Sequence, residues 1–493
     1  MNMTRNLVFT AAGVCLLAGC FLPAVGPDYQ RSEITASEAS LKAPGAGWPM
    51  TTNLTETGEY KPALESEDPR AMLKVEDIRR WWRQFDDEIL SGLVENAVSN
   101  NRSFLMAQQR LAQARWRYAG SWSDFIPHFD AVGSAVRSYG AGNGPSGKFK
   151  RGTFRAGFDA AWEIDLFGGV RRGVEEAEAR MEMANCDLAD AWVSLSSEIG
   201  SLYVELRTVQ QRTQVARANL KLQTETYDIL KSRLDSGIGD ELAVNQAKYN
   251  VDQTHATIPT LLMQEEELMN SLAILAGTMP GALHEQLKVC PDRDWLVEPK
   301  RLETIPLDVM RSRPDVRAAE YALMAQVAHV GVAKSMLFPK FFINGTLGLE
   351  SVNAQKFLRR DSIYSSLGPS FSWPIFQGGA LYANLRAEEA AMDEAALKYE
   401  FVMQTAFGEI RTAYSAYTQE YHRYEALKGA VQAAKDAENI SQDLYKNGLA
   451  DFNNVLDAQR SLLALEESLT ISRGKISQDL VKLYKSLGGG ISM

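Results

Sequence analysis

The residue with the clearest chemistry in this sequence is Cys20, whose thiol stands where a bacterial lipid would be attached. It ends the run Leu17-Ala18-Gly19-Cys20, which follows the positive Arg5 and a short apolar stretch. Small residues before a cysteine fit the lipoprotein signal peptidase, and the thiol is alkylated with diacylglycerol before cleavage. We therefore predict residues 1–19 as a signal peptide and Cys20 as the lipidated start of the mature chain. An ordinary signal peptide beside an incidental cysteine is the alternative.

The residues around and beyond Cys20 refine this prediction. Phe21 follows Cys20. An aspartate at that position favours retention of a lipoprotein in the inner membrane, so Phe21 indicates onward transport from the inner membrane. Cys15 would leave with the signal peptide. Cys186 lies in a predicted helix and Cys290 in a connector, and the sequence leaves a disulfide between them open.

Catalytic and nucleotide-binding patterns find little support. The histidines are scattered, without metal-ligand spacing or a nucleophile elbow: His128, His255, His284, His329 and His422. Residues 142–147 formally match a dinucleotide fingerprint, but they contain Pro145 and precede a strand rather than a helix. A formal charge of -10 argues against a nucleic-acid partner. We predict no enzyme, no metal and no cofactor apart from the lipid on Cys20.

Two long proline-free stretches dominate the chain. Residues 378–487 contain no proline, so we expect one helix of about 100 Å over 379–446, a turn at Gly448 and a return helix. Small and apolar residues recur there at spacings of 3 and 4, a coiled-coil period that lets helices approach closely. Ordinary bundle helices broken at Gly408 and Gly429 are the alternative.

An earlier stretch has the same organisation. Residues 169–236 predict a second long helix, which ends at Gly237-Ile238-Gly239 and returns over 241–275 with a kink at Pro259. Landmarks of the two stretches lie about 210 residues apart: Pro127 and Pro339, Trp162 and Trp373, Phe167 and Phe376, Gly168-Gly169 and Gly378-Gly379, Gly237 and Gly448. The chain is therefore a tandem duplication of helix, two strands, long helix, turn and return helix.

The predicted strands alternate between apolar and polar residues. In 153–166 one face carries Phe154, Phe158 and Trp162 while the other carries Arg155 and Asp159. The pattern alone does not decide whether the apolar face meets a core or lipid. Four strands of about 12 residues could cross a bilayer but could not close a barrel, so a membrane-spanning sheet would be shared by several chains.

These features divide the chain into six segments, with Trp81-Trp82 predicted to pack where an N-terminal arm meets the body. The segments are the signal peptide 1–19, the lipidated extended arm 20–80, the first repeat 81–277, a connector 278–306, the second repeat 307–487 and the tail 488–493.

A set of motifs spread over nearly all of the mature chain resembles the outer-membrane factors, most closely the lipoprotein branch that serves resistance-nodulation-division (RND) efflux pumps. The motifs are Trp81-Trp82 with Phe85, Asp165-Leu166-Phe167-Gly168, Arg313-Pro314-Asp315 with Ala319-Glu320, Phe338-Pro339, Pro374-Ile375-Phe376 with Gly378, and Leu456-Asp457-Ala458-Gln459-Arg460. The resemblance implies a mixed α and β fold. Three chains would share a twelve-stranded transmembrane β-barrel, four strands from each, above a long coiled-coil α-helical periplasmic barrel.

The resemblance also implies a periplasmic gate at the hairpin tips. Asp457 matches the second acid of the family's Asp-Val-Leu-Asp pattern, whereas Asn454 replaces the first and makes this tip less negative. A helix acid favoured by the helix dipole is the alternative account of Asp457. The gate candidates are Asp457, Asn454, Asp451, Asp240 and Glu241, and the partner-docking tips are Gly237, Gly239 and Gly448. For Arg313-Pro314-Asp315 we favour a helix start over a binding site.

As function, the resemblance implies the passive, gated exit channel of a tripartite efflux system in the outer membrane of a Gram-negative bacterium. Its expected partners are two further copies of the chain, a periplasmic membrane-fusion adaptor, an inner-membrane RND-type transporter and outer-membrane lipid. A pore-free coiled-coil envelope lipoprotein and the outer-membrane channel of a type I secretion system are the alternatives.

Overall fold

The computed structural model describes most of the chain as two compact units. The described residues are 23–30, 80–140, 143, 150–289, 310–447 and 449–489, with the short antiparallel strands β1 (Thr52–Leu54) and β2 (Tyr60–Pro62). Cys20, Cys290 and Gly448 lie outside the described residues. The first unit comprises 1–33, 109–186 and 317–401, and the second comprises 34–108, 187–316 and 402–493.

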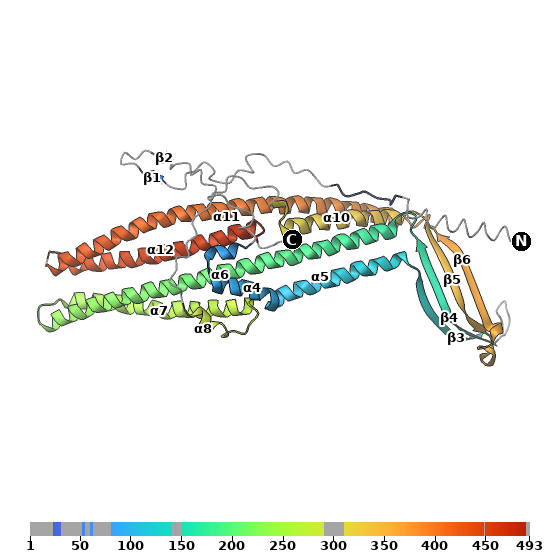
Figure 1. Cartoon of the computed structure of the whole chain (residues 1–493), viewed down its shortest axis with the longest axis horizontal. Coiled ribbons are helices and arrows are strands. Elements are labelled where there is room, and N and C mark those ends of the chain that lie inside the picture. The colour runs from blue at the N-terminus through green and yellow to red at the C-terminus, as the bar shows by residue number, and fades with distance from the viewer. Residues whose placement is uncertain are drawn as a thin grey trace. The chain divides into compact units, whose positions relative to one another are not determined.

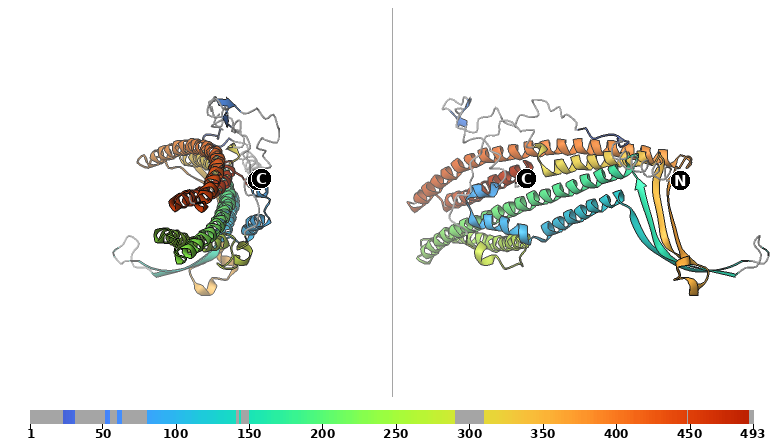
Figure 2. Two further views of the ribbon diagram at one scale, coloured as in Figure 1. Left: turned by 90° about the vertical axis from the view of Figure 1, so that its left-hand side faces the viewer. Right: turned by 45° about the vertical axis from the view of Figure 1, so that its right-hand side comes forward.

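The first unit holds a four-stranded antiparallel sheet in the order β3-β4-β5-β6. Its strands are β3 (His128–Tyr139), β4 (Lys150–Ile164), β5 (Lys340–Ser351) and β6 (Ile363–Ser372). The two predicted strand pairs are thus joined through β4 and β5. The strands lie side by side and bend along their length (Figures 1 and 2).

The register of the sheet collects the apolar residues on one face, as the alternation predicts. Phe158, for example, stands opposite Leu347, and Phe341 opposite Phe371. The apolar face is exposed within the chain: Phe129 is 73% and Leu367 82% exposed. Within the described residues it therefore packs on no core. Among the described strands, β3 and β6 each have one hydrogen-bonded neighbour, so both are open edges.

Repeat-related aromatic residues fix the end of the sheet that joins the helices. The indole Nε1 of Trp162 donates to the carbonyl of Phe125 at 2.9 Å, and that of Trp373 donates to the carbonyl of Leu337 at 3.1 Å. The rings of Phe167 and Phe338 stack at a centroid distance of 4.7 Å. The duplication therefore extends from sequence landmarks to equivalent contacts.

The long helices follow the predicted bounds closely. They are α6 (Gly169–Asp235), α7 (Glu241–Leu275), α11 (Ala380–Lys446) and α12 (Phe452–Ser486). At 67 residues, α6 and α11 are each about 100 Å long. Gly408 and Gly429 lie inside α11 without breaking it, which contradicts the alternative of shorter bundle helices. Pro259 lies inside α7.

The helical pattern before β3 is less regular than the sequence suggested. We expected one helix, but the structure has α4 (Glu88–Asn100) and α5 (Arg102–Ser121). The break falls at Asn101, whose Oδ1 accepts a hydrogen bond from the Phe104 amide at 2.9 Å and so caps α5. The remaining helical elements are η2 (Trp81–Phe85), η3 (Trp122–Phe125), α8 (His284–Leu287), α10 (Pro314–Ser335), η4 (Ala354–Lys356) and η5 (Arg360–Ser362).

Within the described ranges, none of the helices has an apolar stretch long enough to cross a membrane.

Part of the predicted N-terminal arm lies on the first unit. The Val25 amide donates to the Phe167 carbonyl at 3.1 Å, and Asp28 pairs with Arg172 at 2.6 Å. Gly26 has a φ of +113°, and a Cβ there would stand 2.6 Å from the Cα of Gly331. The close approach of the two backbones requires glycine, so this segment packs in one defined position on the unit.

The paired tryptophans are packing residues, as predicted, and they belong to the core of the second unit. Trp81 is fully buried and stacks on Tyr484 at 6.3 Å. Next to this aromatic cluster a buried polar chain runs from Asp87 through the Tyr203 hydroxyl to Arg207, with each link at 2.9 Å. Burial raises the pKa of Tyr203, so its hydroxyl stays protonated and donates to Asp87.

The Arg313-Pro314-Asp315 motif begins a helix, which confirms the structural interpretation. Pro314 is the first residue of α10 and Asp315 lies in its first turn. Arg313 is buried and donates to the Ser486 carbonyl at 2.6 Å and to Glu409 at 2.7 Å. Nearby, burial and the carboxylate of Asp315 raise the pKa of Asp190.

The raised pKa of Asp190 predicts a pH-dependent effect of Asp190→Asn. The folded chain binds the Asp190 proton more tightly than the unfolded chain does. The stabilisation of the folded state by this proton is fully present below the ordinary carboxyl pKa of about 3.9, and it is lost as the pH rises through the raised pKa of Asp190. We expect the variant trimer to melt at a higher temperature than wild type at pH 7, with the difference shrinking towards pH 4. Asp228→Asn, an exposed change on the same helix, is the control. An unchanged or lower melting temperature at pH 7 would contradict this account.

Candidate gating site

The candidate site lies in the second unit, where each long helix turns into its return helix. At the α6–α7 turn the Gly237 amide donates to the Leu234 carbonyl at 2.9 Å, and the Ile238 amide donates to the Arg233 carbonyl at 3.1 Å. Gly237 has a φ of +77°, and a Cβ on Gly239 would stand 2.4 Å from the Leu234 nitrogen. Both glycines are thus required by the turn itself. The equivalent Gly448 lies outside the described residues.

Two of the predicted gate acids cap the return helices. Asp240 accepts a hydrogen bond from the Leu242 amide, and Asp451 accepts one from the Asn453 amide, both at 3.0 Å. Glu241 is the first residue of α7, where a negative charge complements the helix dipole. The structure therefore gives these exposed acids a local stabilising role, which would accompany any role in a gate.

Asp457 and Asn454 occupy the first turns of α12. The Asp457 side chain is 78% exposed, and its Oδ1 lies 4.0 Å from Nη1 of Arg460. The backbone N–H of the exposed Asn454 donates to the Asp451 carbonyl at 3.1 Å. Unlike Asp240 and Asp451, Asp457 caps no helix, so most of its carboxylate faces solvent.

An apolar cluster holds the two hairpins together beside the turns. The first hairpin is α6 with α7, and the second is α11 with α12. The buried members of the cluster come from α6, α7 and α12. Its buried members are Leu230, Ala243, Ala247, Phe452, Val455 and Leu456, with Tyr227, Val244 and Tyr445 packed around them. The Phe452 and Tyr445 rings are 5.3 Å apart. The small Ala243 and Ala247 let α7 approach α12 closely.

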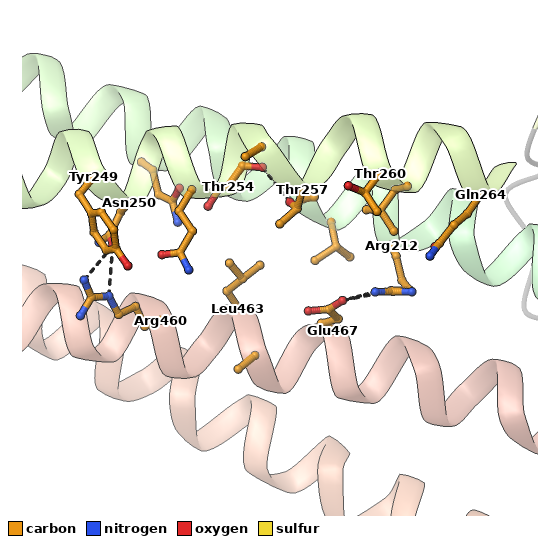
Figure 3. A pocket seen from close by; sticks show the side chains of 17 residues that line it. Arg212, Tyr249, Asn250, Thr254, Thr257, Thr260, Gln264, Arg460, Leu463 and Glu467 are labelled. Atoms are coloured by element: carbon orange, nitrogen blue, oxygen red, sulfur yellow. Dashed lines mark hydrogen bonds and ion pairs between the residues drawn. The ribbon is translucent and has the colours of Figure 1, made fainter. Parts of the chain in front are cut away.

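Behind this cluster the hairpins enclose a polar groove of about 880 Å³. Arg460 of α12 points across it and donates from Nε at 3.1 Å and Nη2 at 3.0 Å to Oδ1 of Asn250 on α7 (Figure 3). Its guanidinium also lies 5.7 Å from the Tyr249 ring. One arginine of the second hairpin is thus held by two neighbouring residues of the first.

Further along the groove, charged side chains link the two hairpins. Arg212 of α6 donates from Nε to Glu467 of α12 at 3.1 Å, and the pair is visible in Figure 3. Glu466 accepts from Asn219 at 3.2 Å and lies 3.2 Å from the Lys435 ammonium group. These links join residues roughly 200 or more apart in the chain, apart from the Lys435–Glu466 pair.

The interior of the groove also contains polar atoms that bind nothing within the described chain. Nδ2 of Asn250 and Oε1 of Gln223 are buried there without hydrogen-bond partners. Leaving such groups unsatisfied costs stability, whereas an exposed hydrogen bond exchanges with water at a small net free energy. The contact between the two hairpins along this groove is therefore of modest strength. Water that entered between the hairpins would form hydrogen bonds with the polar atoms that are unpaired while the hairpins are in contact.

The sequence pointed to only part of this site. Arg460 ends one of the motifs that carry the family resemblance. Its partner Asn250 has no signal of its own in the sequence, because the contact depends on how two hairpins pack. Arg212 and Glu467 were missed for the same reason. A search for arginine and carboxylate pairs at equivalent heights on the two hairpins could have suggested them.

Residues 93–278 and 306–489, one span in each repeat, match the family described as outer membrane efflux protein. The chain belongs to that family. The resemblance to outer-membrane factors is thereby confirmed.

Individual relatives cover almost the whole chain. The probable efflux pump outer membrane protein TtgC of Pseudomonas putida is 28% identical over 99% of this chain and 96% of its own length. The cation efflux system protein CusC of Escherichia coli is 26% identical over 99% of each. The solved structure of the outer-membrane channel OprN is 32% identical, with a TM-score of 0.82 over 94% of this chain and 99% of OprN.

Family membership settles the architecture and the class of function. This family member is a subunit of a trimeric channel, and each chain supplies four strands to the shared barrel. It is the outer-membrane exit channel of an efflux system. The predicted fold class and conduit function are confirmed, and the exposed apolar face of β3–β6 is the face that meets lipid.

The geometry of the groove predicts the effect of Arg460→Met, which keeps an unbranched side chain of moderate length but removes both hydrogen bonds to Asn250. If this link holds the hairpins together, the variant should show a severalfold higher resting conductance in planar lipid bilayers. Arg423→Met is the matched control, since Arg423 bonds Glu420 within its own helix. Equal resting conductance of Arg460→Met and wild type would contradict a latching role.

Proposed function

We propose that the hairpin tips of three chains form the periplasmic gate of this channel and the docking site for its partners. A periplasmic membrane-fusion adaptor would grip the tips and connect the channel to an inner-membrane RND-type transporter. The observation that supports this most directly is the nature of the contact between hairpins. A small apolar cluster and a few polar links can be released without disturbing the core around Trp81.

The closed gate would depend on Asp457. Three exposed carboxylates brought near a three-fold axis repel one another, attract cations and narrow the entrance. Asn454 adds no charge in the preceding turn, so the ring would carry one acid per chain at this level. Asp451, Asp240 and Glu241 would add negative charge near the turns while they stabilise the return helices. Loss of the Arg460 link would accompany opening.

The docking surface would be the turns themselves. Ile238 is 72% and Leu449 75% exposed, which leaves an apolar side chain uncovered at each turn. Gly237 and Gly239 keep the first turn narrow, so a partner could contact its side chains directly, and we propose Gly448 as the equivalent docking position in the second repeat. An adaptor with an apolar helical end would cover them, and the surrounding acids would favour basic residues on that partner.

We also propose that the mature chain is anchored through a lipid on Cys20, its only covalent cofactor. Only a few residues separate Cys20 from Val25, which is hydrogen-bonded to Phe167 just after β4. At no more than about 3.6 Å per residue, the acyl chains would stay beside the helix-proximal end of the sheet. This position would correspond to the inner leaflet of the outer membrane. The channel itself would move cargo passively and perform no catalysis.

The lipid proposal predicts that Cys20→Ser removes the acyl mass from the mature chain. Mass spectrometry of the purified protein measures this directly, because the thiol that carries the lipid is gone. Cys15→Ser is the control, since Cys15 would be removed with the signal peptide and the lipid should remain. A Cys20→Ser protein that still carries the acyl mass would contradict the assignment.

The gate proposal predicts that Asp457→Asn weakens block by divalent cations on the periplasmic side, because it removes the three charges that attract them. The change should raise the half-blocking concentration severalfold in single-channel recordings, with little effect on assembly. Asp443→Asn is the control, since Asp443 is an exposed acid of α11 that pairs with Lys446. If both variants behave as wild type, Asp457 does not line the gate.

A further inference from the structure

The two turn ends of the β-sheet carry an unusual concentration of positive charge. The β3–β4 and β5–β6 connections lie at the same end, as the pairing of Tyr139 with Lys150 and of Phe154 with Ser351 requires. Among the described residues there, two are acidic, Glu350 and Asp361. The basic residues are Arg137, Lys150, Arg151, Lys356, Arg359 and Arg360. The whole chain, by contrast, has a formal charge of -10.

Two of these basic residues belong to the lipid face. Arg137 stands opposite Gly152, and Lys150 opposite Tyr139, in the rows that carry Phe129 and Phe154 on the apolar face. Arg137, Tyr139 and Lys150 are all exposed. The Lys150 ammonium group lies 5.7 Å from the centre of the Tyr139 ring. The neighbouring Arg151 falls on the opposite, polar face, because successive strand residues alternate.

The position of this pair along the strand matches one boundary of a bilayer. On the apolar face of β4, Lys150 lies at one end of the strand and Trp162 lies near the other. Twelve residues at about 3.3 Å, tilted by roughly 40°, span about 30 Å, the thickness of the hydrocarbon core. Trp162 and Trp373 form an uncharged boundary at one end. Arg137 and Lys150 form a charged boundary at the other.

The charged boundary faces the cell exterior. The tryptophan end leads directly into the first turns of α6 and α11, which belong to the periplasmic helices. The turns lie at the opposite end of the same strands, so the lipid headgroups that surround them belong to the outer leaflet. A cationic pair at this boundary attracts an anionic partner, since headgroups of opposite sign stabilise its charge.

We propose that Arg137 and Lys150 of each chain bind the phosphate groups of a phosphorylated glycolipid in the outer leaflet. The Arg137 guanidinium forms charge-assisted hydrogen bonds to one phosphate, which Lys150 approaches from the adjacent strand beside the Tyr139 ring. The acyl chains of the glycolipid lie along the apolar row below. This inference rests on the barrel that the family assignment establishes and is independent of the gate.

The experiment compares binding of two lipids to the purified trimer in detergent by native mass spectrometry. One is bisphosphorylated lipid A, and the other has the same acyl chains without phosphates. Wild type should prefer the phosphorylated lipid by about tenfold or more, and added salt should reduce the preference. Arg137→Gln with Lys150→Gln should abolish most of it, whereas Arg151→Gln, on the polar face, should retain it.

Two results would overturn the proposal. One is equal binding of the two lipids to wild type, and the other is an equal loss of preference in Arg151→Gln and the double variant. The second result would mean that the preference follows the total positive charge of the turn end and not a site on the lipid face. Arg137→Lys keeps the charge and should preserve the preference, which guards against a double variant that fails to assemble. Conductance of each variant, measured separately, shows whether the channel itself is intact.

Discussion

The constraint on which this structure depends is the incompleteness of its β-sheet. Strands β3 and β6 each leave one row of backbone donors and acceptors without a partner in the described chain. The sheet also exposes an apolar face that includes Phe129 and Leu367. Water disfavours the apolar face, and lipid does not tolerate the open edges. Only pairing between copies of the chain satisfies both conditions, so membrane insertion and assembly are coupled.

The same closure organises the helices. The α6 helix begins five residues after β4, and α11 begins eight residues after β6. Each repeat therefore links two strands to one long hairpin, and a ring of strands imposes a ring of helices. Small residues such as Ala243 and Ala247 then permit close approach where the hairpins meet. The links between hairpins are modest, as a contact that must open requires, whereas the core around Trp81 and Arg207 is fully buried.

Much of the fold was predictable because its signals are local and repeated. The absence of proline and the period of the apolar residues gave α6, α7 and α11 to within about one residue at each end. The break at Asn101 was missed, because a side chain that caps one helix can stand inside a pattern that continues across it. Alternation identified the strands but left the environment of their apolar face open. Exposure within the chain and membership of the family resolved that question.

The candidate site was less accessible to sequence reasoning. Motif resemblance indicated Asp457, and its exposed position accords with a gate, which stays a prediction. Contacts such as Arg460 with Asn250 depend on the packing of two hairpins and have no local signature. The central claim, that chains complete one another's sheet, is tested most directly by a cryo-electron microscopy structure of the protein in lipid nanodiscs. We predict three chains, with β6 of each hydrogen-bonded to β3 of the next in a closed barrel. Open four-stranded sheets, or a single chain in the lipid, would contradict it.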